Sequence, residues 1–282
     1  MPELPEVQTV VDDLLKAKLV GNSIIRVQVF YPRIIAEPAA ARFRNRLTGL
    51  TVTGIRRRGK YIILDLSGLS HLLIHLRMTG HLYLDTGKSR RGAHDHIVFT
   101  LSDGRRMRYH DPRKFGRLSL VNDPGKILDR LGPEPLSRAF TARALSRLMA
   151  PRRRMLKPLL LDQTFIAGLG NIYVDEALWE ACLHPCRNTS TLDTRDIKRL
   201  HRAIRRVLRR GIRNGGTTLG RGETGFSSVT GRSGDNKREL RIFRRLDASC
   251  PRCRGAIRRL IVGQRSSFVC ETCQPVCETG EK

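Results

Sequence analysis

Hydrophobic positions near the start of the chain recur with the period of an α-helix. The pattern follows Pro5 and predicts an amphipathic helix over residues 5–18. Gly21 and Asn22 follow it, and both residue types are common where a helix stops. The apolar positions are Val7, Val10, Val11, Leu14 and Leu15.

The chain then changes to the composition of β-structure. Short stretches rich in β-branched and aromatic residues alternate with glycine-containing turns, such as residues 102–104. This pattern predicts an antiparallel sandwich or barrel. The stretches expected as strands are Ile24–Phe30, Tyr61–Leu66, Leu72–Leu76, Ile97–Leu101 and Arg117–Val121.

Beyond residue 135 the pattern becomes helical. Residues 122–135 are rich in proline and glycine, and we interpret them as an interdomain connection. Residues 196–213 place apolar side chains on one face, and nearly all of the remaining positions are Arg or Lys. Two interpretations stay open: a solvated face whose cations suit the helix dipole, or a face that contacts DNA. Residues 220–238 have no apolar period and predict a long loop.

The charge balance favours a polyanionic partner. The 282 residues include 53 Lys and Arg against 26 Asp and Glu, a formal net charge of +27. Such an excess opposes compaction, and nucleic acid is the leading partner class, although a solvated cationic surface is the alternative. No apolar run approaches the ~18 residues of a membrane span, and the acidic start is unlike a secretory signal. We therefore expect a cytoplasmic protein with no membrane association and with reduced cysteines.

Cysteine spacing near the C-terminus predicts a metal site. Two Cys-x-x-Cys pairs are separated by sixteen residues, which is typical of a zinc ribbon. Four thiolates close a tetrahedral site without an open position, so one structural Zn²⁺ is expected. The pairs are Cys250 with Cys253 and Cys270 with Cys273. Cys182 and Cys186 lie outside this pattern and are expected to be core or partly exposed thiols.

A second motif is the Gly-Leu-Gly-Asn sequence of residues 168–171, between two apolar segments. Two glycines permit a tight turn, and Asn171 is expected to cap the helix that follows, with Asp175 and Glu176 in its first turns. Backbone N–H groups at such a helix N-terminus can bind a phosphate. The signal is weak alone, because helix-turn-helix units are often only structural.

The N-terminus offers a nucleophile. Removal of Met1 would leave Pro2 with a free secondary amine, and an α-amino group titrates near about 7.7–8.0, so more of it is neutral than of a lysine. A neutral amine can attack a sugar C1′ and form a Schiff base, and the adjacent Glu3 can give or take protons. The position alone also fits an ordinary N-terminus that starts a helix.

Six motifs together resemble the formamidopyrimidine-DNA glycosylase family, in the family's order, from Met1 to about Gln274. The resemblance implies an enzyme of base excision repair that removes oxidised purines from damaged double-stranded DNA and then cleaves the strand. The matching segments are residues 2–7 (PELPEV), 58–61 (RGKY), 75–80 (HLRMTG), 111–116 (DPRKFG), 168–173 (GLGNIY) and 263–268 (GQRSSF).

The resemblance implies roles for four residues in catalysis. Pro2 is the Schiff-base nucleophile and Glu3 the proton donor and acceptor. Lys60 matches the lysine assigned to β-elimination, and Arg265 the arginine assigned to δ-elimination. Zinc would only hold the hairpin that presents Arg265, and no other cofactor is implied.

The resemblance also implies DNA contacts. Met78, Arg113 and Phe115 would fill the space left by an extruded base. Alternation along the strand alone leaves Met78 compatible with a core position. The positions that match phosphate contacts are Lys60, His75, Asn171 and Arg265, with His94 and Arg153 as further DNA-contacting positions.

The implied architecture is an α+β multidomain protein, in which an N-terminal helix and antiparallel β-sandwich precede a helix–two-turn–helix domain with a C-terminal zinc ribbon of four cysteines. A monomer is expected. The expected divisions are a catalytic domain (1–122), a linker (123–136), the helix–two-turn–helix domain (137–219), a lesion-loop candidate (220–239), the zinc finger (240–275) and a tail (276–282).

Two departures and two alternatives accompany the resemblance. Residues 220–236 do not follow the family's usual wording, which leaves lesion preference open, and the tail with Cys277 is an addition. One alternative is an endonuclease VIII-type glycosylase for oxidised pyrimidines. The other is a non-enzymatic, zinc-stabilised nucleic-acid-binding protein, which would not need Pro2 and Glu3.

Overall fold

The protein is described by a computed structural model that covers residues 2–87, 89–220 and 225–276. The chain forms two compact units. The first consists of Met1–Arg130 with Gly211–Lys237, and the second of Leu131–Arg210 with Arg238–Lys282. The tail from residue 277 onward, including Cys277, lies outside the described residues.

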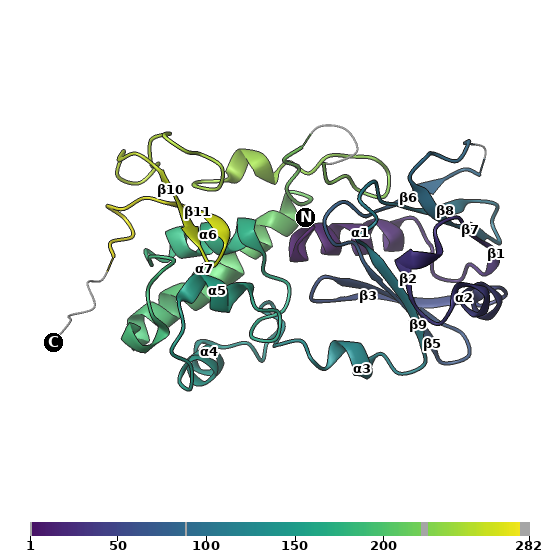
Figure 1. The fold of residues 1–282 in the computed structure, drawn as a ribbon, viewed down its shortest axis with the longest axis horizontal. Coiled ribbons are helices and arrows are strands. Elements are labelled where there is room, and N and C mark those ends of the chain that lie inside the picture. Colours follow the sequence, from purple (N-terminus) through teal and green to yellow (C-terminus); the bar gives the residue numbers. More distant parts are fainter. Residues whose placement is uncertain (1, 88, 221–224, 277–282) are drawn as a thin grey trace. The chain divides into compact units, whose positions relative to one another are not determined.

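The first unit contains the helix α1 (Leu4–Lys16) and two sheets (Figure 1). The four-stranded sheet is antiparallel, in the order β1 (Ile24–Val29), β7 (Asp95–Leu101), β8 (Arg106–His110) and β6 (His81–Asp85). The five-stranded sheet has the order β2 (Ile35–Glu37), β9 (Arg117–Val121), β5 (Ser70–His75), β4 (Tyr61–Leu66) and β3 (Val52–Arg58). The remaining elements are η1 (Pro32–Ile34), α2 (Ala40–Leu47) and α3 (Gly125–Leu128).

One hydrophobic core joins both sheets and α1. Val10 and Leu14 of α1, Ile74 of the larger sheet, and Phe99 and Met107 of the smaller sheet belong to the same buried cluster. The apolar period of α1 and the alternation along the strands therefore meet in one interior. The predicted helix-plus-sandwich architecture is confirmed, although the short strand β2 pairs with β9 in parallel and not antiparallel.

The second unit is helical and ends in a β-hairpin (Figure 1). The long helix α7 (Thr194–Arg213) begins in this unit and ends in the first. No helix in the described ranges is both long and apolar enough to cross a membrane. The other elements of this unit are α4 (Ala142–Met149), α5 (Leu156–Leu161), α6 (Asn171–Glu180), η2 (Thr189–Thr191), β10 (Arg258–Val262) and β11 (Arg265–Val269). The short helix η4 (Asn236–Glu239) begins in the first unit and ends in the second.

The cap of α6 differs from the prediction by one residue. Gly170 is the N-cap, with φ −137° and ψ −166°, and Asn171 is the first helical residue. The side-chain Nδ2 of Asn171 instead donates to the backbone carbonyl of Ser266, 3.0 Å away. The prediction was wrong because this side chain bonds to a distant segment, which local capping rules do not describe.

Candidate functional sites in the two units

The N-terminal residues are anchored at the start of α1. Pro2 is buried, and Glu3 is only 2% exposed as the N-cap of α1. The carboxylate of Glu6 accepts a hydrogen bond of 2.8 Å from the Glu3 backbone N–H. These partners are three positions apart in the sequence, so the contact is half of a capping box and orders the chain next to Pro2.

Glu6 also holds a segment from far along the sequence. Its other carboxylate oxygen accepts from the backbone N–H of Thr217, 2.7 Å away. A Cβ atom at Gly216 would lie 3.0 Å from Cγ of Glu6, and Gly216 has φ +84°. A glycine is therefore required where this segment passes over the start of α1. Sequence reasoning did not single out Glu6, and its only signal was the Glu-x-x-Glu spacing.

Lys60 lies in the turn between β3 and β4. The residue is 6% exposed, and Gly59 before it has φ +56°. The guanidinium of Arg57 donates to the Gly59 carbonyl (2.8 Å) and to Oε1 of Gln8 in α1 (2.9 Å). These two bonds tie the turn that carries Lys60 to the N-terminal helix.

His75, at the end of β5, is a neutral imidazole. Burial lowers its pKa to about 3, and the nearby cations Arg77 and Lys60 add to the shift. Its Nδ1 accepts from the Arg77 backbone N–H at 3.0 Å, so the ring proton is on Nε2. A neutral ring with an Nε2 donor can bind a phosphate oxygen without carrying charge itself.

Two loops present the exposed residues Met78, Arg113 and Phe115. Met78 is 38% and Phe115 47% exposed, so neither is a core side chain. The Arg113 guanidinium lies over the Phe115 ring, 4.8 Å from its centroid. Large apolar side chains exposed together with an arginine match the chemistry of an intercalating wedge.

One buried carboxylate organises both of these loops. Asp111 accepts from the Thr79 hydroxyl (2.6 Å) and from the backbone N–H groups of Arg113 (3.2 Å) and Gly116 (2.8 Å). A Cβ atom at Gly116 would lie 1.5 Å from the Tyr109 hydroxyl, so only glycine fits there. Asp111 lies in a recognised motif, but its positioning role was missed because it depends on contacts between two distant loops.

His94 and Arg153 have different environments. The carbonyl of His94 accepts from the backbone N–H of Asp111 at 3.0 Å, and its ring lies 5.7 Å from that of His110. Arg153, in the second unit, is exposed.

In the second unit, Arg265 lies at a tight β-hairpin turn. Gly263 and Gln264 both have positive φ, +54° and +61°, and Val262 pairs with Arg265 across the turn. This is the geometry of a two-residue hairpin loop. Arg265 is exposed, and together with Asn171 it lines a cavity of about 530 Å³.

A buried ion pair joins this hairpin to the helices. Nζ of Lys157 contacts Asp175 (2.6 Å) and the Ser266 carbonyl (2.8 Å), and Asp175 accepts from the Phe268 backbone N–H (3.1 Å). Burial raises the pKa of Asp175 to about 7, against the opposing effect of Lys157. Asp175 therefore positions the hairpin, a role that helix-dipole reasoning did not predict.

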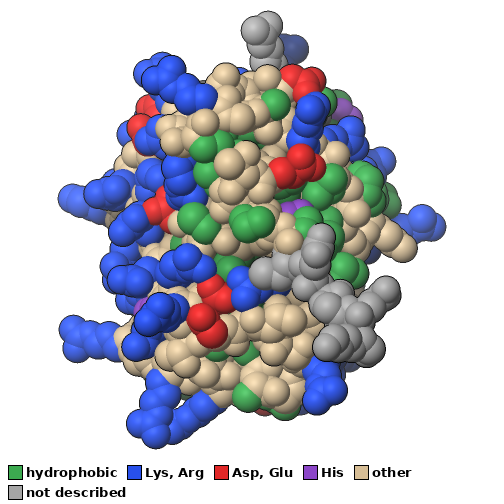
Figure 2. Space-filling model, turned by 90° about the vertical axis from the view of Figure 1, so that its left-hand side faces the viewer, with side chains coloured by type: hydrophobic (Ala, Val, Ile, Leu, Met, Phe, Trp, Pro, Cys, Tyr) green, Lys and Arg blue, Asp and Glu red, His purple; other side chains and the backbone are tan. Residues whose placement is uncertain are grey.

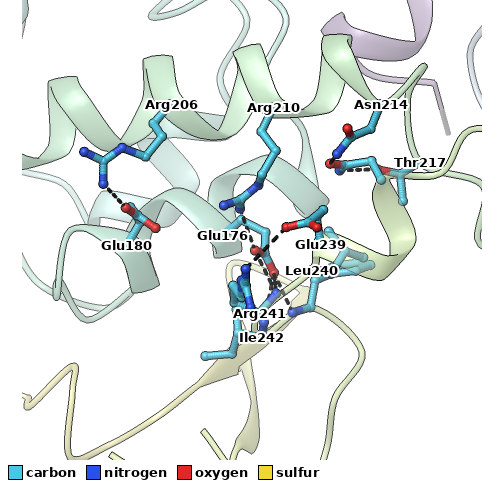
Figure 3. A network of polar contacts seen from close by, with 12 residues as sticks. Glu176, Glu180, Arg206, Arg210, Asn214, Thr217, Glu239, Leu240, Arg241 and Ile242 are labelled. Carbon is cyan, nitrogen blue, oxygen red and sulfur yellow. Dashed lines mark hydrogen bonds and ion pairs between the residues drawn. The ribbon is translucent and has the colours of Figure 1, made fainter. Parts of the chain in front are cut away.

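Glu176 performs a similar function for the segment before the zinc ribbon (Figure 3). Its carboxylate accepts from the consecutive backbone N–H groups of Arg241, Ile242 and Phe243 at 2.9–3.0 Å. Arg210 of α7 lies 3.5 Å from the same carboxylate. Burial raises the pKa of Glu176, and the three N–H donors and Arg210 oppose that effect.

The four predicted cysteines converge on a metal site. The sulfurs of Cys250, Cys253, Cys270 and Cys273 all lie within 4.8 Å of one another. Zinc–sulfur bonds of about 2.3 Å fit such a tetrahedron, so this is the site of one structural zinc. The Trp179 indole donates to the Cys250 sulfur at 3.4 Å, which links the ribbon to α6. Cys182 and Cys186 are partly exposed, as predicted.

Comparison with known proteins assigns the chain to a protein family. Three family domains match it: the Formamidopyrimidine-DNA glycosylase N-terminal domain (residues 1–118), the H2TH domain of the same family (131–222) and the zinc finger found in FPG and IleRS (250–276). The chain belongs to the formamidopyrimidine-DNA glycosylase family. It is accordingly an enzyme, a DNA glycosylase with a structural zinc finger.

Relatives of known name are similar over nearly the whole chain. The formamidopyrimidine-DNA glycosylase of Protochlamydia amoebophila is 44% identical over 97% of this chain and 99% of its own length. That of Pelotomaculum thermopropionicum is 44% identical over 98% and 100%.

Solved structures of a bacterial relative have the same fold and were determined with DNA. The Lactococcus lactis protein in complex with DNA containing an abasic site aligns with a TM-score of 0.89 and 35% identity, covering 97% of this chain and 99% of that one. Its complex with N7-benzyl-Fapy-dG DNA gives a TM-score of 0.89 and 36% identity, covering 97% and 100%.

Proposed function

We propose that this enzyme excises oxidised purines, formamidopyrimidine and 8-oxoguanine, from double-stranded DNA and then cleaves the strand by β,δ-elimination. The observation that carries the proposal is the N-terminus, where Pro2 and Glu3 are buried together at the start of α1. A buried carboxyl group beside an α-amine supplies the acid–base pair that glycosidic cleavage needs.

The first step would use both residues. After removal of Met1, the secondary amine of Pro2 attacks C1′ of the damaged nucleotide and displaces the base, while Glu3 transfers the protons. Opening of the sugar ring, with a proton going to O4′, leaves a positively charged Schiff base (an iminium) between C1′ and the Pro2 nitrogen, and this group acidifies the C2′ proton. Loss of that proton expels the 3′ phosphate, a step assigned to Lys60, and loss of the 5′ phosphate follows, assigned to Arg265.

The remaining residues would hold the DNA and fill its stack. Met78, Arg113 and Phe115 replace the extruded base, and their exposure suits that role. His75 and Asn171 bind phosphates with Lys60 and Arg265, and His94 and Arg153 contact DNA as well. We further propose that the enzyme is a monomer in the cytoplasm, and that residues 220–239 act as the lesion loop within the domain divisions given above.

The test is a lesion panel with a matched variant. Duplexes with one 8-oxoguanine, formamidopyrimidine or 5-hydroxyuracil are incubated with wild type and with Glu3→Gln. The wild type is expected to excise the two purine lesions faster, and Glu3→Gln to bind the 8-oxoguanine duplex without excising the base. Faster excision of 5-hydroxyuracil would favour the endonuclease VIII-type alternative. Full excision by Glu3→Gln would remove Glu3 from the mechanism.

A further inference from the structure

The exposed side of α7 carries an uninterrupted row of cations. Successive residues of an α-helix are offset by about 100°, so the positions that share one arc can be read from the sequence. Of the residues from Thr194 to Arg210, those that lie within one arc of about 100° are all Lys or Arg. We call this row the basic stripe; its members, all exposed, are Arg195, Lys198, Arg199, Arg202, Arg206 and Arg209.

The basic stripe extends about 21 Å along the helix, at 1.5 Å per residue. The opposite face of α7 is apolar and buried, with Leu200 and Ile204 at 0% exposure. Figure 2 shows one face of the protein, on which Lys and Arg side chains crowd the left half of the view and acidic side chains are fewer.

Few carboxylates neutralise these cations. Arg199 pairs with Asp196, and Arg206 pairs with Glu180 at 2.5 Å. Asp193 lies near Arg195, because backbone hydrogen bonds and the Arg195 charge lower the pKa of its carboxyl group. No ion pair with a carboxylate is found for Lys198 or Arg209 among the residues that the structure describes. The unpaired members therefore leave a net positive surface along the helix.

Helix stability does not account for the basic stripe. Like charges three or four residues apart destabilise a helix, and the row repeats that spacing throughout. Cations suit only the C-terminal end of the helix dipole, whereas Arg195, Lys198 and Arg199 lie in the first turns. A polyanionic partner would offset both the repulsion between the cations and their unfavourable interaction with the helix dipole.

We propose that the basic stripe binds the backbone of a second DNA duplex, separate from the duplex that holds the lesion. Duplex DNA carries one charge per ~1.7 Å of axis with both strands counted, so a 21 Å length of duplex holds on the order of ten phosphates, of which the row faces a part. The cations are mostly arginine, whose planar guanidinium matches phosphate geometry. The stripe contains no aromatic side chain on which unpaired bases could stack, which favours a duplex over a single strand.

Other occupants fit less well. A membrane-binding helix inserts an apolar face, but that face of α7 is buried in the protein. A second copy of this chain would also carry a net charge of +27 and would be repelled.

The basic stripe also differs from the proposed lesion-binding surface of the second unit. Helix α6 meets α7 through Glu176 and Glu180, in its C-terminal half. Asn171 is at the other end of α6, beside the hairpin that carries Arg265. The end of α6 that pairs with the stripe is therefore the end away from Asn171 and Arg265, and we infer that the two surfaces bind separate DNA segments.

The experiment uses zinc-loaded, full-length protein and two duplexes. A bait duplex with a tetrahydrofuran abasic analogue is fixed to beads, and a fluorescent undamaged duplex is added. The stripe variant is Arg195→Gln/Arg202→Gln/Arg209→Gln. The control, Arg26→Gln/Arg42→Gln/Arg44→Gln, removes the same charge from exposed positions of the first unit. Circular dichroism checks that both are folded.

Wild type and control are expected to capture the fluorescent duplex, and the stripe variant to lose at least ten-fold of that capture while cleaving a short 8-oxoguanine duplex normally. In free protein every basic surface contributes to binding of an undamaged duplex, so titration of that duplex tests the stripe through the difference between the stripe variant and the control. There, the slope of log affinity against log salt should fall by about three, for three lost phosphate contacts. Equal capture by stripe variant and control would overturn the proposal, as would wild-type binding to phosphatidylglycerol vesicles in place of the second duplex. If the protein does not bind the tetrahydrofuran bait but still binds the undamaged duplex through the stripe, that result would count against the proposed lesion site and not against the stripe.

Discussion

At the scale of single residues, the structure makes His75 a neutral hydrogen-bond donor rather than a cation. Its folded pKa of about 3 lies below the ordinary value of 6.5. The unfolded chain therefore binds more protons between pH 6.5 and about 3, and folding stability falls as the pH decreases through that window.

Replacement of His75 by glutamine, which does not titrate, removes this dependence. We expect the unfolding midpoint in urea to fall more between pH 7.5 and pH 5 for wild type than for His75→Gln. The same loss in both proteins would show that His75 does not carry the depressed pKa.

The choice of substrate can distinguish a role of Met78, Arg113 and Phe115 in base extrusion from a role in the chemical steps. Met78→Ala and Arg113→Ala should lose more activity on an 8-oxoguanine duplex than on a preformed abasic site, because an abasic site has no base to extrude. Single-turnover cleavage of both substrates measures the difference. Met155→Ala, another exposed methionine, is the matched control and should lose neither activity. Equal losses on both substrates in a folded Met78 variant would mean that the side chain positions DNA generally.

At the scale of elements, two glutamates one helical turn apart on α6 have unequal importance. Glu176 accepts three backbone N–H bonds and is 1% exposed, whereas Glu180 makes one ion pair with the largely exposed Arg206. Glu176→Ala leaves buried donors without a partner and should cost about 2–4 kcal/mol. Glu180→Ala should cost less than ~1 kcal/mol. Thermal unfolding of the zinc-loaded variants compares them, and similar losses would refute the role of Glu176.

The zinc ribbon should depend on its four cysteines alone. Cys253→Ala is expected to lose zinc and, with it, DNA affinity, because the hairpin that carries Arg265 loses its scaffold. Cys186→Ala should keep both. Zinc content by mass spectrometry and DNA affinity by anisotropy give the readouts, and retained zinc in Cys253→Ala would show that other ligands hold the metal.

These elements also show how far sequence alone reaches. Strands β4 and β9 have the predicted bounds, and α1 and α7 differ by one or two residues, because a strong apolar period determines them. Strands β3, β6 and β8 were not predicted; β3, for example, reads Val-Thr-Gly-Ile-Arg-Arg-Arg and depends on pairing with β4. The positioning groups Glu6, Asp111 and Glu176 were missed because their partners are distant in sequence.

At the scale of the whole molecule, the proposed chemistry is distributed along the chain. Pro2, Glu3 and Lys60 belong to the first unit, whereas Arg265 and the zinc ribbon belong to the second. A net charge of +27 gives the protein a general affinity for DNA that depends on salt. The specific chemical step must come from a few residues, and we propose that the Pro2 amine is the central one.

Covalent trapping tests that centre most directly. The enzyme is incubated with an 8-oxoguanine duplex and borohydride, and the trapped protein is digested and mapped by mass spectrometry. We expect a chain that begins at Pro2, with the reduced sugar adduct on the Pro2 nitrogen. An adduct on an internal lysine such as Lys60, or an N-terminus that retains Met1 in active enzyme, would contradict it.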